Sequence, residues 1–479
     1  MPNETGPNLP RIRYHGGTAG ALLPFLIFAV GVVAVALSGA PDERGFWPLL
    51  VLALMAGLAL AREKRAFCEA VVAGMARPIV MIMILAWILA SSLGILMQDT
   101  GLVEGLTWLA GRMGLGGAGF AAGVFLVCAL VSVATGSSFG TILICGPILF
   151  PAGGLAGAPS AVLAGAILGG ATFGDSIAPI SDTTIAGALS QKADIGGTVR
   201  SRLPLVLPAA AVALALTIPL ALIEGAGPAS SAMTAGGDPR GLPMLLVPAV
   251  VIALLLAGRH LLEGLFAGLA AGTVLGLALG LMEPARLLSL DLEHRTARSF
   301  LIDGIERAAG ISFFTILLMG LVAVLESAGL LEKLVEFARR RSRSPRAAES
   351  WIVGAVSGAV LVTCHSIVAI LTVGEFARRT GERLGIGPYR RAHLLSLTVS
   401  TYPFILPYFI PVILAANTTL SGGDYGIPPV SPLQAGLHNL YSWALVVVVG
   451  LMLGLGWGGR SKGEEARSTP SPAGDGPVA

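Results

Sequence analysis

Long apolar runs separated by short polar segments dominate the pattern of hydrophobic and polar positions along this chain. Most runs approach the ~20 residues that a helix needs to cross a bilayer. The pattern therefore predicts an all-α polytopic membrane protein with about ten full spans, two of which are broken helices. The expected spans are residues 19–37, 46–61, 78–97, 160–190, 203–223, 242–258, 261–282, 306–328, 392–419 and 436–457.

Two further apolar runs have flanking charges that argue against a crossing. Arginines flank residues 351–376 on both sides, so by the positive-inside rule both flanks lie in the cytoplasm. This run is predicted to be a re-entrant hairpin that enters from inside, and residues 116–150, with few cations nearby, are predicted to form one that enters from outside. The expected turns are Thr135, Gly136, Ser137 and Ser138 in the first hairpin and Thr363, Cys364, His365 and Ser366 in the second. Irregular backbone at this depth must be buried in protein or line a cavity, so the two tips should meet near the midplane.

The two hairpins belong to an internal repeat, visible at a constant offset of 228 positions (329 − 101). The matching pairs include Gly101 with Gly329, Glu104 with Glu332, Thr135 with Thr363, Ser138 with Ser366, Gly146 with Gly374, and Pro179 with Pro407. Segment 98–114 has a single cation, whereas its counterpart 326–342 has Lys333 and three arginines, which places the two on opposite faces. The prediction is a pair of inverted-topology repeats, an architecture of secondary transporters.

The resulting organisation has six parts. They are two N-terminal spans (1–77), a first repeat (78–202), connecting spans (203–305), a second repeat (306–419), a last span (420–459) and a disordered cytoplasmic tail (460–479). The basic loop 62–77 is expected in the cytoplasm, loop 224–241 outside, and segment 283–303 along the outer surface. Both termini are therefore predicted to be cytoplasmic, in a multi-pass protein of the plasma (inner) membrane.

Composition excludes other classes of protein. Hydrophobic residues make up 54% and charged residues 12%, far from the ~25% charged residues of soluble domains. The four cysteines lie singly, without the spacing of a metal cluster or a disulfide framework. No HExxH or GxSxG motif suggests an enzyme. The arginine clusters fit topology and lipid headgroups better than nucleic acid.

The segment from Gly170 to Gly187 carries two aspartates, Asp175 and Asp182, inside an apolar run. A carboxylate at the bilayer centre costs roughly 2.5–3.5 kcal/mol, so two of them need a compensating role. The alternative is a polar loop whose aspartates cap the next helix. However, 33 residues separate Pro159 from Lys192 (192 − 159), more than the ~20 of a straight span, and the surplus indicates a broken helix.

The residues around the aspartates suit a cation site in an unwound helix. The expected helix-breaking residues are Gly174 and Pro179 in the first broken helix and Pro403 and Pro407 in the second. Beside the aspartates, the expected ligands are the hydroxyls of Ser181, Thr183 and Thr184. The expected site-lining residues at the hairpin tips are Thr135, Gly136, Ser137, Ser138, Thr363, His365 and Ser366.

Some of these residues have equally good local explanations. The hydroxyls of Ser137 and Ser138 could bond back onto their own helix. His365 could titrate, contact an anionic substrate, or be a hydrogen-bonded buried histidine. Glu326 and Glu375 lie near predicted helix ends and are expected to be solvated.

A proton and a cation would compete for such a site. Burial favours the neutral form of a carboxylate, whereas a bound Na+ favours the ionised form. Competition at one alternately exposed site produces exchange. We therefore expect no resident cofactor. Na+ and protons are the expected transported species, with Na+ bound at Asp175 and Asp182. A passive channel would also explain polar residues at the midplane, but two inverted copies favour alternating access.

The stretch FGDSIAPISDTT, Phe173 to Thr184, followed by QKADIGGTVRSRL, resembles the signature of the NhaC-type sodium/proton antiporters of the ion transporter superfamily. The resemblance implies inverted repeats with two hairpins, a mobile transport domain and a homodimer. It places Asp175 and Asp182 at the motif aspartates and Ser181, Thr183 and Thr184 at its hydroxyl positions. Ser176 and Ile185 stand where the motif has lysine and asparagine. These departures leave open a sodium- or proton-coupled transporter of a small organic anion or amino acid.

Overall fold

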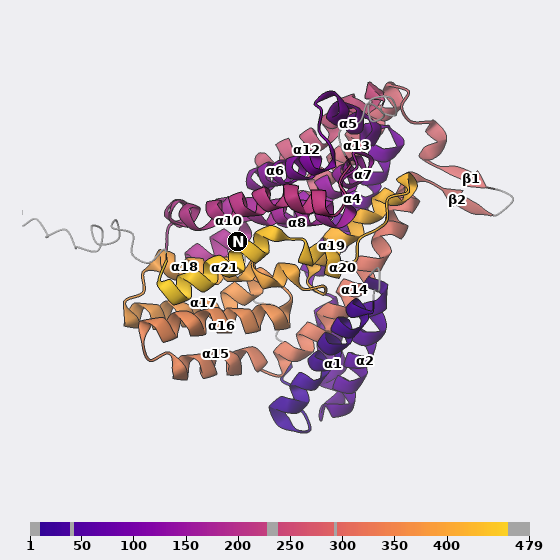
Figure 1. Ribbon diagram of the computed structural model, residues 1–479. Helices are drawn as coiled ribbons and strands as arrows, with labels where there is room; N and C mark the ends of the chain where they lie inside the picture. Colours follow the sequence, from indigo (N-terminus) through magenta and orange to yellow (C-terminus); the bar gives the residue numbers. More distant parts are fainter. Residues whose placement is uncertain (1–9, 39–42, 228–237, 292–294, 458–479) are drawn as a thin grey trace, which may run out of the picture.

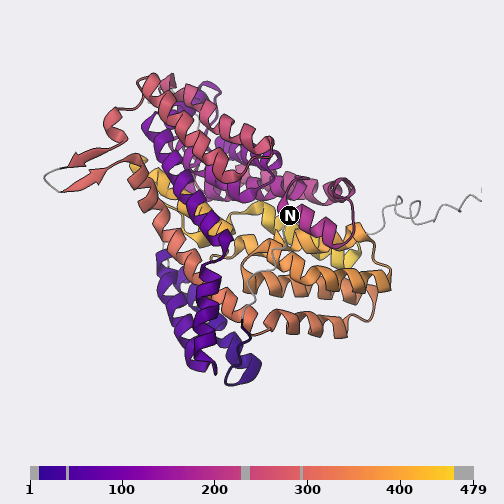
Figure 2. The same cartoon turned by 180° about the vertical axis from the view of Figure 1, so that it is seen from behind.

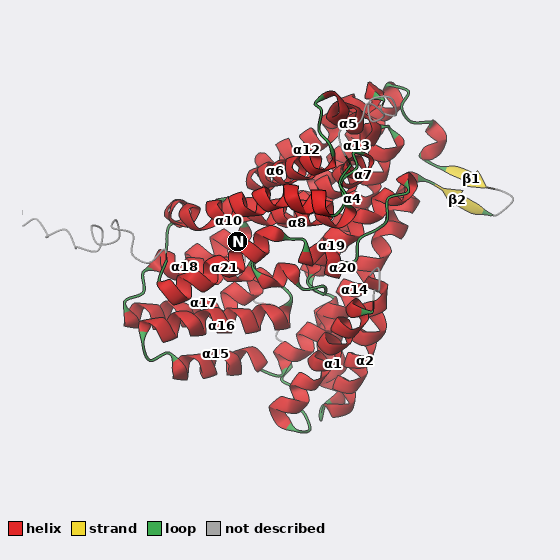
Figure 3. Cartoon of the chain, viewed as in Figure 1, coloured by secondary structure: helices red, strands yellow, loops and turns green. Residues whose placement is uncertain are grey.

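The protein is described by a computed structural model that covers residues 10–38, 43–227, 238–291 and 295–457. Helices form nearly all of it (Figure 3). The first half contains α1 (Gly17–Leu37), η1 (Glu43–Phe46), α2 (Trp47–Leu60), α3 (Lys64–Met75), α4 (Pro78–Asp99), α5 (Leu102–Arg112), α6 (Gly117–Thr135), α7 (Ser138–Leu155), α8 (Ser160–Ile177), α9 (Asp182–Ser190) and α10 (Ile195–Ile223).

The second half begins with η2 (Pro239–Leu245), α12 (Leu246–Leu256), α13 (Leu261–Ala278), η3 (Pro284–Arg286) and strands β1 (Ser289–Asp291) and β2 (Thr296–Arg298). It continues with α14 (Phe300–Ser327), α15 (Leu330–Arg341), α16 (Pro345–Thr363), α17 (Ser366–Leu384), α18 (Pro388–Val399), η4 (Tyr402–Ile405), α19 (Ile410–Thr418), η5 (Thr419–Tyr425), α20 (Pro432–Leu437) and α21 (Leu440–Leu455). The tail predicted from residue 460 lies outside the described residues.

The structure confirms an all-α polytopic membrane protein. Among the described residues, nine helices are long and apolar enough to cross a membrane, or ten if the bent pair Pro388–Ile405 and Ile410–Tyr425 is one span. These nine include α8 and α9 taken together as one span, Ser160–Ser190, and both α6 and α7, the arms of the first predicted hairpin. The helices α2 and α21 are apolar but shorter.

Two connecting segments contain regular structure. Residues 62–77 contain α3, whose buried residues Phe67, Ala70 and Gly74 recur at helical spacing and pack on α14. The lysine and arginine residues around this segment made it resemble a basic loop, so the helix was not predicted. Segment 283–303 contains the antiparallel pair β1–β2, which projects from the helical body (Figure 1), and its place along the outer surface of the membrane stays a prediction.

The bounds of the elements repeat at the predicted offset of 228. α6 and α16 cover positions 117–135 and 345–363, α7 and α17 begin at 138 and 366, and α9 and α19 cover 182–190 and 410–418. Helix ends therefore coincide as well as residues, which agrees with the predicted internal repeat. In the second copy, α15, α16 and α17 lie one below another on the side of the molecule away from β1–β2 (Figure 1).

The equivalent helices α4 and α14 pack side by side in opposite directions (Figure 2). Arg77, at the start of α4, forms an ion pair with Glu326, near the end of α14. Arg307, in the first turns of α14, donates to Gln98 at the end of α4 at 3.3 Å. These opposed directions agree with inverted copies, and the orientation of the copies in the membrane stays a prediction. Glu326 is 17% exposed and ion-paired, so the expectation that it is solvated is wrong.

Candidate functional site

One cavity lies where the two hairpin tips meet the two broken helices. Its volume is about 60 Å³, room for several water molecules at the roughly 10–15 Å³ that each requires. The lining residues are Gly136, Ser137, Ser138, Phe139, Asp175, Asp182, Thr183, Cys364, His365, Ser366, Ile367, Ser400, Phe404 and Phe409. Segments that are far apart in the sequence therefore converge on both aspartates.

The first broken helix is interrupted between Ile177, the last residue of α8, and Asp182, the first residue of α9. Pro179 lies in the interruption, and the preceding Ala178 is extended (ψ 123°), as the residue before a proline prefers. Residues 178–181 do not continue the helix, so the last turn of α8 has carbonyl groups without a partner within the helix, and one of them, that of Ser176, accepts from Arg202.

Gly174 was predicted to help break this helix, and that prediction is wrong. It lies within α8, three residues before the helix ends. A Cβ at this position would lie 2.3 Å from the carbonyl oxygen of Ala129 in α6. Gly174 therefore allows α8 to approach α6 closely, a packing role that only the tertiary structure reveals.

The two aspartates have different surroundings. Asp175 is 6% exposed and accepts hydrogen bonds from the Ser181 hydroxyl and the Ser138 backbone N–H. Asp182 is exposed towards the cavity at the start of α9, where the helix dipole favours a negative charge. The two carboxylates interact electrostatically across the interruption. A buried carboxylate thus lies behind an accessible one.

The predicted hydroxyl ligands divide into two groups. The Ser181 and Thr183 hydroxyls are 2.9 Å apart, and Thr183 lines the cavity. Thr184 is buried and accepts a hydrogen bond from Arg202 instead. Thr363 donates to the carbonyl of Ala359, and neither it nor Thr135 is among the lining residues.

The first hairpin tip depends on a left-handed residue. Gly136 has φ +67°, and a Cβ there would lie 2.6 Å from the side chain of Ile180, in the interruption of the first broken helix. The Ser137 hydroxyl caps α7 by accepting from the Gly140 N–H at 3.0 Å, which is the local role considered for it. Ser138 reaches Asp175 through its backbone N–H.

The second hairpin tip has the same backbone conformation as the first but carries a cysteine and a histidine. Cys364 takes the left-handed conformation (φ 51°) that glycine occupies in the first tip. His365 follows in extended conformation, precedes α17 and lines the cavity. Within the described part of the chain its Nδ1 is buried and has no hydrogen-bond partner. No hydrogen bond at this nitrogen therefore fixes the ring.

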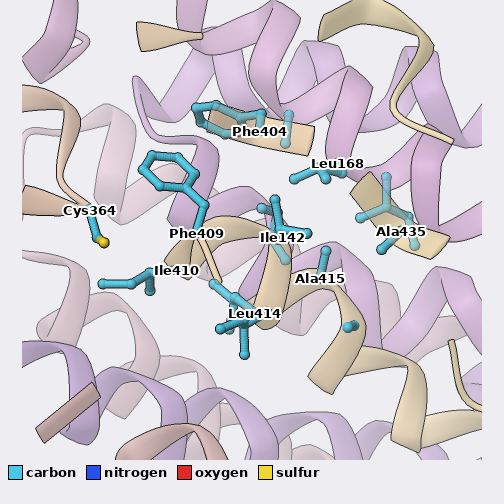
Figure 4. Close-up of a cluster of buried hydrophobic side chains, with 14 of the residues drawn as sticks. Ile142, Leu168, Cys364, Phe404, Phe409, Ile410, Leu414, Ala415 and Ala435 are labelled. Carbon is cyan, nitrogen blue, oxygen red and sulfur yellow. The ribbon is translucent and has the colours of Figure 1, made fainter. Parts of the chain in front are cut away.

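The second broken helix supplies an apolar wall. Pro403 lies in η4 and Pro407 follows it, so both interrupt the segment between α18 and α19 as predicted. Phe404 and Phe409 pack edge to face at 5.1 Å near Cys364 (Figure 4). Ser400 is the polar residue that this segment adds to the lining.

Arg202 was not among the predicted site residues, but it lies behind the cavity. It is 1% exposed and donates to the carbonyl of Ser176 (2.8 Å), the Thr184 hydroxyl (3.1 Å) and the Ser396 hydroxyl (2.6 Å). It therefore joins both halves of the first broken helix to α18 and interacts electrostatically with Asp175. Its position beyond Lys192 and Arg200, at the start of an apolar run, was the available signal.

A family profile and two known proteins match parts of this chain. The profile described as the Na+/H+ antiporter family matches residues 10–223 and 239–401. The chain is 40% identical over 90 residues to the malate-2H+/Na+-lactate antiporter of Bacillus subtilis, a stretch covering 19% of each protein. It is 45% identical over 65 residues to the Na+/H+ antiporter NhaC of Alkalihalophilus pseudofirmus, covering 14% of each. The matched stretches thus span less than a fifth of these relatives.

A likeness to one solved structure covers most of the chain. It is the YdaH transporter of Alcanivorax borkumensis, with 17% sequence identity and a TM-score of 0.42, over 88% of this chain and 100% of that one.

Proposed function

The chain belongs to the Na+/H+ antiporter family, and we propose on that basis that it exchanges a monovalent cation, Na+ first of all, for protons at Asp175 and Asp182. It is a multi-pass membrane transporter and not an enzyme. One observation carries the proposal. Both aspartates line a single cavity where two helix interruptions meet two hairpin tips.

The two aspartates have different roles in this proposal. Asp182, exposed in the cavity, binds the entering cation or proton, and Asp175, with its two hydrogen-bond donors, supports the negative charge behind it. The Ser181 and Thr183 hydroxyls, with the carbonyls left at the interruption, are oxygen ligands of the kind that a hard cation prefers. A proton neutralises the carboxylate that the cation requires ionised, so the two species exclude each other.

The test is a flux assay in vesicles that contain a pH-sensitive dye. A proton gradient is imposed and Na+, Li+ or K+ is added outside. We expect a cation-driven change of internal pH that is lost in Asp182→Asn and in Asp175→Asn. Glu263→Gln, an exposed carboxylate on α13, is the matched control and should behave as wild type.

Two outcomes contradict the proposal. If folded wild-type protein responds to no cation, simple antiport is rejected. If both aspartate variants keep wild-type exchange, the site lies elsewhere.

A second candidate is exchange that includes a small organic anion. One relative is named as a malate-2H+/Na+-lactate antiporter. In this chain the N-termini of α7, α9, α17 and α19 all lie at the cavity, and their dipoles favour an anion. His365 adds a nitrogen donor beside them. Uptake of radiolabelled malate or lactate, driven by Na+ or protons and lost in His365→Ala, distinguishes this function from cation exchange alone.

The remaining expectations complete the proposal. We place the protein in the plasma membrane with both termini in the cytoplasm, because basic residues gather in the segments that this topology puts inside. Na+ and protons are transported species in this scheme, and the homodimer stays a prediction.

A further inference from the structure

Four arginines gather where α15 ends and α16 begins. Arg341 is the last residue of α15, and Arg343 and Arg346 follow it in the connection and in the first turn of α16. Arg383 of α17 donates to the carbonyl of Ser342 at 3.0 Å, so it reaches this connection from another part of the chain. All four arginines are exposed, and we call them the arginine cluster.

No carboxylate pairs with the arginine cluster among the described residues. The neighbouring carboxylates along the chain pair with other arginines: Glu336 with Arg339 and Arg340, Glu349 with Arg390, and Glu382 with Arg378. Positive charges held together without a counter-ion repel one another. An anion bound from outside the chain would relieve this repulsion.

Two aromatic rings hold one member of the cluster in place. The Arg341 guanidinium lies 4.4 Å from the ring centre of Phe337 and 5.8 Å from that of Trp351. The two rings pack edge to face at 5.3 Å. These contacts use the face of the guanidinium and leave the N–H groups at its edge available for a bidentate ligand such as phosphate.

The first copy forms the same helices without these charges. The counterparts of the arginine cluster at the offset of 228 are Met113, Leu115, Ala118 and Leu155. The helices therefore do not need the arginines in order to form. The positive-inside rule accounts for basic residues on one side of the membrane, but not for a cluster that two separate segments build around Ser342.

The cluster lies next to an apolar segment. From Trp351 to Thr363, α16 has no charged residue, and it ends at the second hairpin tip beside the cavity of the candidate site. Five residues (351 − 346) of helix rise about 7.5 Å. Tryptophan favours the boundary between hydrocarbon and headgroups. With the tip inside the membrane, the cluster thus lies at the depth of the lipid phosphates.

We propose that the arginine cluster binds the phosphate of an anionic phospholipid, and that this lipid fixes the base of the second hairpin. The arginines contact the phosphate, and the rings of Phe337 and Trp351 lie against the apolar part of the lipid. One lipid then joins α15, α16 and α17 at the end of the hairpin opposite its tip. Because the tip lines the cavity, transport should depend on anionic lipid. Lipid binding rests on the cluster alone, whereas its effect on transport rests on the proposed function.

A lipid titration of the full-length protein in neutral detergent tests the binding. Short-chain phosphatidylglycerol is added, and the fluorescence change of Trp351 is isolated by subtracting that of Trp351→Phe. We expect saturable binding that is about thirtyfold weaker in the double variant Arg343→Gln/Arg346→Gln. Each basic residue at an anionic surface contributes about 1 kcal/mol, and 1.4 kcal/mol is tenfold. The matched control, Arg339→Gln/Arg340→Gln, removes two arginines that already have a carboxylate partner and should bind as wild type.

Two comparison ligands establish which anion is bound. Phosphatidylcholine has a phosphate balanced by its own choline, and inorganic phosphate has no acyl chain. We expect neither to compete with phosphatidylglycerol. The proposal is overturned if the Arg343→Gln/Arg346→Gln variant binds phosphatidylglycerol as tightly as wild type. It is also overturned if inorganic phosphate competes equally well, which would assign the cluster to a soluble anion.

The vesicle flux assay, run with and without phosphatidylglycerol, tests the effect on transport. Wild type should exchange faster with the anionic lipid, and Arg343→Gln/Arg346→Gln should show the same slower rate in both compositions. Equal wild-type rates in both compositions overturn the effect of the lipid on the hairpin. Lipid binding without flux of any cation rejects the proposed function and keeps the lipid site. Flux without lipid binding does the reverse.

Discussion

Replacing Arg202 by methionine should destabilise the protein more than any exposed arginine substitution. The methionine has a similar length and suits a buried position, but it has no donor for the Ser176 carbonyl or for the hydroxyls of Thr184 and Ser396. The two halves of the first broken helix would then lose their shared partner, and Asp175 would lose a nearby positive charge.

The magnitude follows from three hydrogen bonds and one buried charge. Hydrogen bonds to charged groups contribute about 1.5–3 kcal/mol each. Removing the guanidinium also removes its own desolvation cost, which is several kcal/mol for a buried ion. The net loss expected on removing one member of a buried charged network is therefore about 3–5 kcal/mol. Arg202→Lys keeps the positive charge but not the planar set of guanidinium donors, so it should lose about half as much free energy of unfolding.

The measurement is equilibrium unfolding of the purified protein in mixed micelles, followed by circular dichroism. Arg200→Met is the matched control, since Arg200 is exposed two residues away and its loss should change the stability by about 0.5 kcal/mol or less. Arg202→Met should also abolish flux in the vesicle assay. Equal stability of Arg202→Met and Arg200→Met would refute the reasoning.

Two other substitutions test the packing and capping near the cavity. Gly174→Ala places a methyl group 2.3 Å from the Ala129 carbonyl oxygen and should cost about 1–3 kcal/mol in the same unfolding assay. Gly123→Ala, where nothing lies within 4 Å, should not destabilise, and a loss as large as that of Gly174→Ala would contradict the packing argument. Ser137→Ala removes the cap on α7 and should cost about 1 kcal/mol, most of which Ser137→Asn restores. If Ser137→Asn is no more stable than Ser137→Ala, the cap is not what Ser137 contributes.

The positions of the hairpin tips and helix interruptions could be predicted from the sequence. Gly136, Pro179 and Pro407 act on their own backbone, through a left-handed conformation or a missing N–H, so their effect is local. The internal repeat could also be predicted, because equivalent positions in the two copies have the same backbone conformation or packing and therefore the same residue. The convergence of both tips on Asp175 and Asp182 followed from the cost of irregular backbone within a membrane.

The tertiary structure alone decided what each side chain near the cavity does. Arg202 binds partners 26 and 194 positions away, so its place at the start of an apolar run could suggest burial but could not identify these partners. Gly174 looked like a helix breaker, but a glycine within a helix can equally mark the close approach of another helix. Thr184 faces Arg202 and Thr183 faces the cavity, because adjacent residues of a helix point in different directions.

The difference between the two copies has the same origin. Leu143 and Leu371 occupy equivalent positions in a repeated pattern, yet one is buried and the other exposed. Sequence determines which surfaces are apolar and which helices form, because these depend on neighbours along the chain. Burial depends on which surface α4 and α14 cover, and that is a property of the assembled structure.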